Sequence, residues 1–171
     1  MDILSHIKVI QDFPKPGINF YDIGSLMTQP AVWAQIIEAM AAKTRPYAPD
    51  IILGIESRGF LVGLPVAQAL GIPFGMIRKK GKLPGAVISL EYDLEYGSDC
   101  IEMQKDVIKS GQRVAILDDL LATGGTMAAS GTLIRQAAAQ PVCGIAMIEL
   151  DGLNGRAKID FPFEALVRAT A

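Results

Sequence analysis

Four short apolar runs along the chain have the length of buried β-strands, and three longer stretches have the pattern of helices. The predicted strands are residues 51–55, 73–77, 113–117 and 142–150. The predicted helices are residues 30–45, 60–70 and 126–138. Strands that alternate with helices indicate an α/β fold with a mostly parallel central sheet flanked by helices on both faces.

The N-terminal segment has a different pattern. Apolar side chains at helical spacing predict a short amphipathic helix over residues 3–10. Pro14 and Gly17 then break the chain, and residues 18–23 have the pattern of a short extended piece.

A polar segment interrupts the alternation in the middle of the chain. Residues 79–86 contain three lysines together with glycine and proline, which predicts a mobile loop between extended arms at residues 87–92 and 101–104. A solvated surface loop is the ordinary meaning of such a cationic patch. The alternative is a lid that brings ammonium groups to a leaving anion and excludes water.

Composition and charge narrow the class of protein. The 171 residues fit a single domain, and no apolar run approaches the length that spans a bilayer. The net charge of −2 gives no general attraction to nucleic acid. The first residues lack a signal-peptide pattern, and the two cysteines, Cys100 and Cys143, suit a reducing compartment, so we expect a cytoplasmic protein.

Residues 114–130, VAILDDLLATGGTMAAS, join a buried strand to a helix through a loop that carries polar chemistry. Asp118 and Asp119 offer hard oxygen acceptors to the hydroxyls of a ribose or to a hydrated Mg²⁺ ion. The loop that follows can wrap a phosphate, because its glycines allow close backbone approach and the next helix directs free N–H groups at the anion. It is not a Walker loop, which needs a Lys-Ser/Thr pair, nor a Rossmann fingerprint, which needs three spaced glycines. The segment therefore predicts a site for a ribose 5-phosphate.

This loop resembles the phosphoribosyl-pyrophosphate (PRPP) binding motif of the type I phosphoribosyltransferases. Four other segments look like those of the adenine phosphoribosyltransferase family, in that family's order. They are residues 12–17 (DFPKPG), 54–60 (GIESRGF), 78–84 (RKKGKLP) and 92–97 (YDLEYG). The resemblance implies the type I phosphoribosyltransferase fold in a single domain, 1–171. A hood over about residues 1–25 and a flexible catalytic loop over about residues 79–97 would complete it.

The family's functional residues carry over to matching positions of this chain. The resemblance implies catalytic roles for Glu95, Arg58, Asp118 and Asp119. It implies phosphate binding by Ala122, Thr123, Gly124, Gly125 and Thr126. Pyrophosphate binding would fall to Glu56, Ser57, Arg58, Lys79 and Lys82, and adenine binding to Asn19, Phe20 and Tyr21. It also implies a cis peptide at Glu56–Ser57, Mg²⁺ carried by PRPP or pyrophosphate with no direct metal ligand, and a homodimer. Its substrates and products would be adenine, PRPP, AMP and pyrophosphate, with no nucleic-acid or membrane partner.

Several assignments have rivals. Arg58 could form a surface salt bridge with Glu56, and Glu91 competes with Glu95, which is favoured through the Leu-Glu-Tyr-Gly match alone. Tyr21 stands where the family typically has an arginine, although a tyrosine preserves the family's main-chain base contacts. The implied reaction is adenine plus PRPP giving AMP and pyrophosphate. The alternatives are a same-fold enzyme for another base and a PRPP-binding regulator without turnover.

Overall fold

The structure, a computed structural model, describes residues 2–93 and 97–170. Its strands are β1 (Lys8–Ile10), β2 (Phe20–Asp22), β3 (Ile51–Ile55), β4 (Phe74–Lys79), β5 (Val87–Asp93), β6 (Ser98–Gln104), β7 (Arg113–Leu121), β8 (Gln140–Asp151) and β9 (Phe163–Thr170). Its α-helices are α1 (Ile23–Met27), α2 (Pro30–Thr44), α3 (Arg58–Leu70) and α4 (Gly125–Gln136). Its 3-10 helices are η1 (Ile3–Ser5), η2 (Arg45–Tyr47) and η3 (Gly155–Lys158).

The strands form one large sheet and one small one. The large sheet has seven strands in the order β5-β6-β4-β3-β7-β8-β9. Strands β4, β3, β7, β8 and β9 run parallel to one another. The β5–β6 hairpin extends the sheet beyond β4, where β6 pairs with β4 in the antiparallel direction. The predicted α/β class with a mostly parallel sheet is therefore confirmed.

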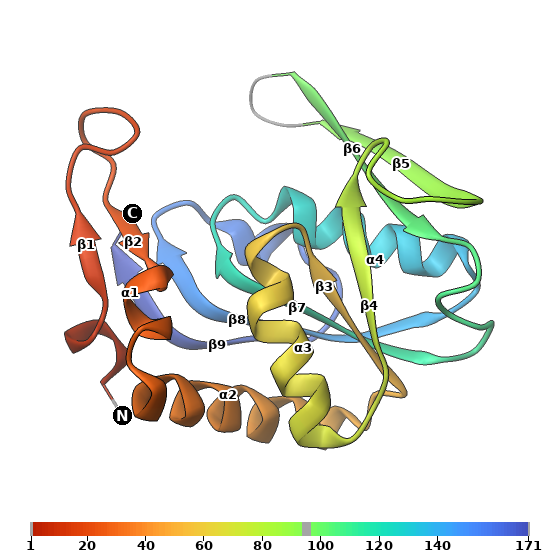
Figure 1. The fold of residues 1–171 in the computed structure, drawn as a ribbon. Coiled ribbons are helices and arrows are strands. Elements are labelled where there is room, and N and C mark those ends of the chain that lie inside the picture. Colours follow the sequence, from red (N-terminus) through yellow and green to blue (C-terminus); the bar gives the residue numbers. More distant parts are fainter. Residues whose placement is uncertain (1, 94–96, 171) are drawn as a thin grey trace.

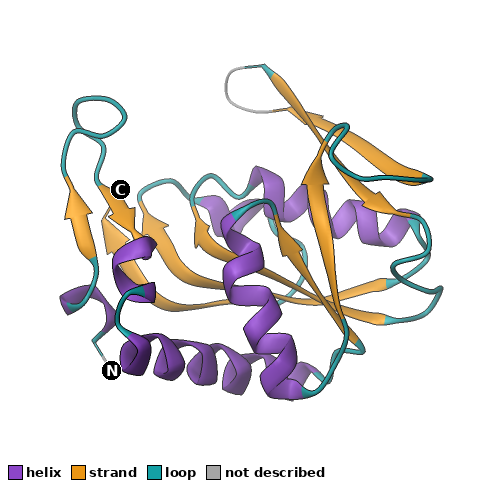
Figure 2. Ribbon diagram, viewed as in Figure 1, coloured by secondary structure: helices purple, strands orange, loops and turns teal. Residues whose placement is uncertain are grey.

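Helices cover both faces of this sheet (Figure 2). Successive side chains of a central strand point to opposite faces, so both faces are apolar and both need a covering layer. In β3, Ile52 joins the core under α2 and α3, whereas Leu53 joins the core on the side of α4. In β7, Leu117 likewise joins the core under α2 and α3, and Ile116 joins the core on the side of α4. Within the described residues, no helix combines the length and apolar character needed to cross a bilayer.

The two smaller parts of the fold flank the large sheet (Figure 1). The β1–β2 sheet, which we call the hood, stands at the β9 end beside the C-terminus, and the β5–β6 hairpin rises at the opposite end. Both reach past the ends of the parallel strands from which ligands of open α/β sheets are bound.

The structure corrects the predicted elements near the two ends of the chain. The helix predicted over residues 3–10 is wrong: η1 covers Ile3–Ser5, and β1 then pairs antiparallel with β2. Helix α1 follows β2 because the Asp22 side chain caps its N-terminus by accepting a hydrogen bond from Gly24 N (3.0 Å). Strand β9 was not predicted, and β7 continues four residues beyond Leu117.

Candidate active site

The loop after β7 closes around a small polar cavity. Strand β7 ends at Leu121 and α4 begins at Gly125, so the phosphate loop of residues 122–126 consists of a three-residue turn and the first turn of a helix. Gly124 adopts φ +76°, a left-handed conformation that favours glycine. The loop and the end of β7 enclose about 110 Å³, lined by Asp118, Leu120, Leu121, Ala122, Thr123, Gly124, Gly125, Thr126 and Met127. The geometry suits a phosphate group at the positive end of α4.

The paired carboxylates at the end of β7 lie against the first turn of α3. A Cβ on Gly59 would come within 3.0 Å of Asp118 Oδ1, so only glycine permits this approach. Asp119 is 3% exposed, and its Oδ2 lies 3.0 Å from Arg58 Nε, an ion-pair distance without the direction of a hydrogen bond. Burial and the charge of Asp119 raise the pKa of Asp118 well above its usual value. Burial and repulsion within the pair therefore favour the neutral form of Asp118, next to the ion pair of Asp119 with Arg58.

The turn after β3 has the predicted cis peptide between Glu56 and Ser57. The Glu56 carboxylate accepts hydrogen bonds from Arg78 Nη2 (3.1 Å) and from the backbone N–H of Lys79 (2.8 Å). The hydrogen bond from Arg78 holds the pKa of Glu56 below its usual value. Because Glu56 is engaged with β4, Ser57 and Arg58 are the members of this turn left to meet a ligand.

Arg58 lies between the carboxylates and the hood. Its guanidinium pairs with Asp119 rather than with Glu56, and its Cζ lies 5.6 Å from the centroid of the Phe20 ring. Phe20 also meets Phe13 edge-to-face, with ring centroids 5.2 Å apart. One side chain thus connects the predicted ribose site to the predicted base site.

The side chain of Tyr21 points away from this site. Phe20 is partly exposed, whereas Tyr21 is 9% exposed and packs into the core under α2. The Tyr21 hydroxyl donates a hydrogen bond to the carbonyl oxygen of Thr170 in β9 (2.8 Å). The backbone of Tyr21 is therefore the part of that residue that the predicted adenine contact can use, whereas Phe20 can also offer its ring.

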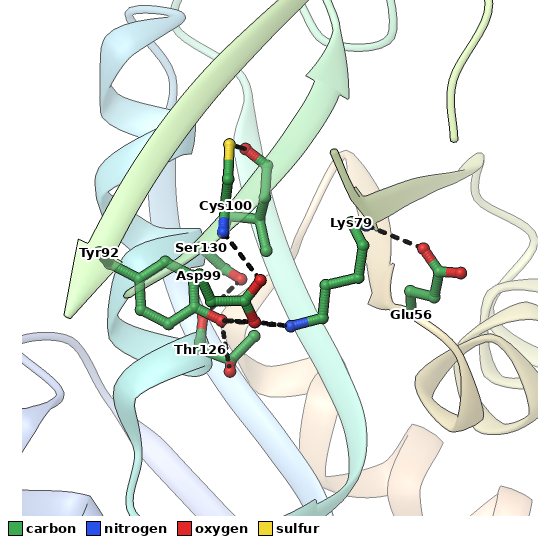
Figure 3. Close-up of polar contacts among 8 residues, drawn as sticks. Glu56, Lys79, Tyr92, Asp99, Cys100, Thr126 and Ser130 are labelled. Carbon is green, nitrogen blue, oxygen red and sulfur yellow. Dashed lines mark hydrogen bonds and ion pairs between the residues drawn. The ribbon is translucent and has the colours of Figure 1, made fainter. Parts of the chain in front are cut away.

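A polar network joins the β5–β6 hairpin to the phosphate loop (Figure 3). The Tyr92 hydroxyl lies 3.0 Å from Thr126 Oγ1 and donates to Asp99 Oδ2 (3.1 Å), which also pairs with Lys79 Nζ. Burial opposes the charge of Lys79, but the bond to Asp99 and the neighbouring contacts leave the pKa of Lys79 raised. Lys79 is therefore an ammonium ion anchored beside the phosphate loop. The network of Tyr92 and Asp99 was not predicted, since its partners lie far apart in the sequence.

The remaining predicted residues are less constrained. The side chain of Lys82 is exposed, and Lys80 Nζ lies 3.6 Å from Glu91 Oε1 on the surface. Glu95 lies outside the described residues, so its assignment stays a prediction. Among the residues that the structure does describe, no group of three His, Cys, Asp or Glu side chains could hold a metal ion.

Comparisons with known proteins agree with this geometry. The phosphoribosyl transferase domain family matches residues 22–165. An adenine phosphoribosyltransferase of Rhodospirillum centenum is 53% identical over 167 residues, which cover 98% of each chain. The crystal structure of the adenine phosphoribosyltransferase of Thermoanaerobacter pseudethanolicus has a TM-score of 0.95 and 42% identity, with 98% of each chain covered.

A second solved structure is that of the Saccharomyces cerevisiae adenine phosphoribosyltransferase, complexed with an imino-altritol bisphosphate and adenine. It has a TM-score of 0.92 and 38% identity to this chain, with 96% of each chain covered. Sequence and fold thus agree over nearly the whole length. The chain belongs to the adenine phosphoribosyltransferases of the phosphoribosyl transferase domain family.

Proposed function

We propose that this site transfers the 5-phosphoribosyl group of PRPP to adenine and gives AMP and pyrophosphate, a reaction of purine salvage. One observation carries the proposal. Arg58 lies against Asp119 on one side and Phe20 on the other, so the ribose, pyrophosphate and base positions meet at one guanidinium. The adenine bound in the related yeast enzyme supports the choice of base.

The chemistry asks for charge stabilisation more than for bond making by the protein. Displacement at the anomeric carbon passes through a state in which the ribosyl ring becomes cationic and pyrophosphate leaves with added negative charge. Arg58, at the start of α3, and Lys79, beside the phosphate loop, would receive that charge. Asp118 and Asp119 would hold the ribose hydroxyls and face the developing positive charge.

Mg²⁺ enters this proposal as part of the substrate. A hydrated ion carried by PRPP neutralises its diphosphate and makes it a better leaving group. The residues present fit such an ion, because Asp119 Oδ2 is buried and accepts no hydrogen bond from the described residues. Asp118 and Asp119 would hold the ion through its water ligands or through the ribose it accompanies.

The base would be read mainly by the hood backbone. A backbone N–H and C=O pair matches the acceptor and donor edge of adenine, whereas hypoxanthine presents a carbonyl where adenine presents an amino group. The mismatch would leave buried polar groups unpaired, which can discriminate strongly between bases. The Phe20 ring would pack against the purine, held in place by Phe13 and Arg58.

We also propose that the protein is a cytoplasmic homodimer. Leu61 and Leu64 on α3 and Met76 on β4 are large apolar side chains that stay exposed, as subunit interfaces require. Both cysteines are free and buried, which suits a reducing compartment.

The test is base-dependent release of pyrophosphate. Purified protein is given PRPP and Mg²⁺ with adenine, and the release of pyrophosphate is compared with a sample that lacks any base. An enzyme of the proposed kind releases pyrophosphate only with the base and forms one AMP for each pyrophosphate. A PRPP-binding regulator would bind PRPP and release none, which would refute the proposal.

A further inference from the structure

The connection between β8 and β9 lies directly against the phosphate loop. A Cβ on Gly155, in η3, would overlap the carbonyl oxygen of Ala122 and come within 2.9 Å of Gly124 N. A Cβ on Gly124 would in turn overlap the carbonyl oxygen of Gly155. The two backbones are therefore in van der Waals contact, and the position of η3 sets the outer wall of the phosphate loop.

The residue after Gly155 fixes η3 to the sheet. Arg156 donates two hydrogen bonds to the Glu149 carboxylate, from Nε to Oε1 (3.0 Å) and from Nη2 to Oε2 (2.5 Å). Its third nitrogen, Nη1, donates to the carbonyl oxygen of Phe163 (2.6 Å), and its Cζ lies 4.9 Å from the centroid of the Phe163 ring. The guanidinium thus has a bidentate partner in β8 and a second partner in β9.

The Glu149 carboxylate lies in the sheet level with the start of the phosphate loop. Glu149 is 7% exposed near the end of β8, and it is the register partner of Leu121, the last residue before the loop. The hydrogen bond from Arg156 keeps the pKa of Glu149 below its usual value, and Arg168 Nε, 3.4 Å from Oε2, acts in the same direction. Loss of Arg156 would leave the buried Glu149 carboxylate with Arg168 as its ion-pair partner, whereas loss of Glu149 would detach the half-exposed Arg156 guanidinium from β8.

We propose that Arg156 and Glu149 are positioning residues for the 5-phosphate. They touch no substrate, but they hold Gly155 against Ala122 and Gly124 and so keep the loop in the shape that receives the phosphate. The inference rests on the proposed function, which assigns this loop to the 5-phosphate of PRPP and AMP. Pyrophosphate binds elsewhere in that assignment, at Ser57, Arg58 and Lys79, none of which is bonded to Arg156 or Glu149, so its affinity should not depend on the pair.

The test compares two ligands by isothermal titration calorimetry, ribose 5-phosphate and pyrophosphate with Mg²⁺. Hydrogen bonds to charged groups contribute about 1.5–3 kcal/mol, so we expect Glu149→Gln to loosen η3 and to weaken ribose 5-phosphate at least about tenfold. Pyrophosphate affinity should stay within about twofold of the wild-type value, and the KM for PRPP should rise more than kcat falls.

A matched control removes another arginine ion pair to the connection between β8 and β9. Arg135 Nη2 lies 2.8 Å from Asp160 Oδ1, away from Gly155, and Arg135→Gln should leave both affinities unchanged. Arg156→Lys keeps the charge without the fork and should give an intermediate loss if Glu149→Gln does not fold. Equal weakening of both ligands, or no weakening of ribose 5-phosphate, would overturn the inference. Failure of the proposed function is distinguishable, because the wild type would then release no pyrophosphate from PRPP in the presence of adenine, whether or not it binds ribose 5-phosphate.

Discussion

Tyr21 gives a quantitative test of how the hood works. Its hydroxyl donates to Thr170 O at 2.8 Å from a side chain that is 9% exposed, so Tyr21→Phe removes one hydrogen bond and leaves the packing of the ring intact. Such a bond contributes about 1 kcal/mol to the free energy of unfolding. In a domain of this size that loss should lower Tm by about 2–4 °C.

The same variant should leave base choice unchanged, because the Tyr21 side chain points to the core rather than to the base. We would measure Tm by calorimetry and the adenine and hypoxanthine kcat/KM by pyrophosphate release. Tyr47→Phe is the matched control, since it removes a hydroxyl hydrogen bond to Glu164 Oε1 (2.9 Å) that joins η2 to β9. A gain in hypoxanthine use by Tyr21→Phe, absent from the control, would refute the assignment of base reading to the hood backbone. Tyr21→Arg should destabilise far more, because it places a guanidinium in an apolar cluster.

Four further predictions address the charges of the site. Asp118→Asn together with Asp119→Asn should abolish turnover, as a pyrophosphate assay would show, while circular dichroism reports a folded protein. Because the pKa of Asp118 is raised in the folded state, stability falls as pH rises above the ordinary carboxyl range, and Asp118→Asn alone should flatten that fall in Tm measured against pH. Arg58→Ala should raise the Kd of pyrophosphate and PRPP much more than that of AMP, and an equal loss for AMP would make Arg58 a structural or 5-phosphate residue. Chelation of Mg²⁺ by EDTA should stop turnover without changing the Tm of the ligand-free protein; a lower Tm would indicate a resident metal.

The central sheet could be predicted because its strands are buried on both faces. Continuous apolar runs such as residues 51–55 are needed for that burial, and they are visible in sequence. The N-terminal prediction was wrong because β1 is fixed by a partner strand ten residues further on, and pairing overrides a short helical periodicity. Strand β9 lies at the sheet edge with a mixed burial pattern, so it lacks the continuous apolar run of a central strand.

In the site, too, local features could be predicted from the sequence, whereas features that depend on tertiary packing could not. The phosphate loop could be predicted because strand end, glycines and helix start are contiguous in residues 114–130. The contacts of Tyr92 with Thr126 and of Gly155 with Gly124 depend on how distant segments pack, which no local pattern records. A signal for Glu149 did exist, since it is a carboxylate at the end of a long apolar run and hence at the ligand-binding edge.

The central claim is that the site at this edge selects adenine and joins it to the phosphoribosyl group. The most direct measurement gives the protein PRPP and Mg²⁺ with an equimolar mixture of adenine, hypoxanthine and guanine, and identifies the nucleotides by mass spectrometry. The account predicts AMP as the dominant product, with one pyrophosphate released for each AMP. Inosine or guanosine monophosphate in amounts comparable to AMP, or pyrophosphate release without any nucleotide, would contradict it.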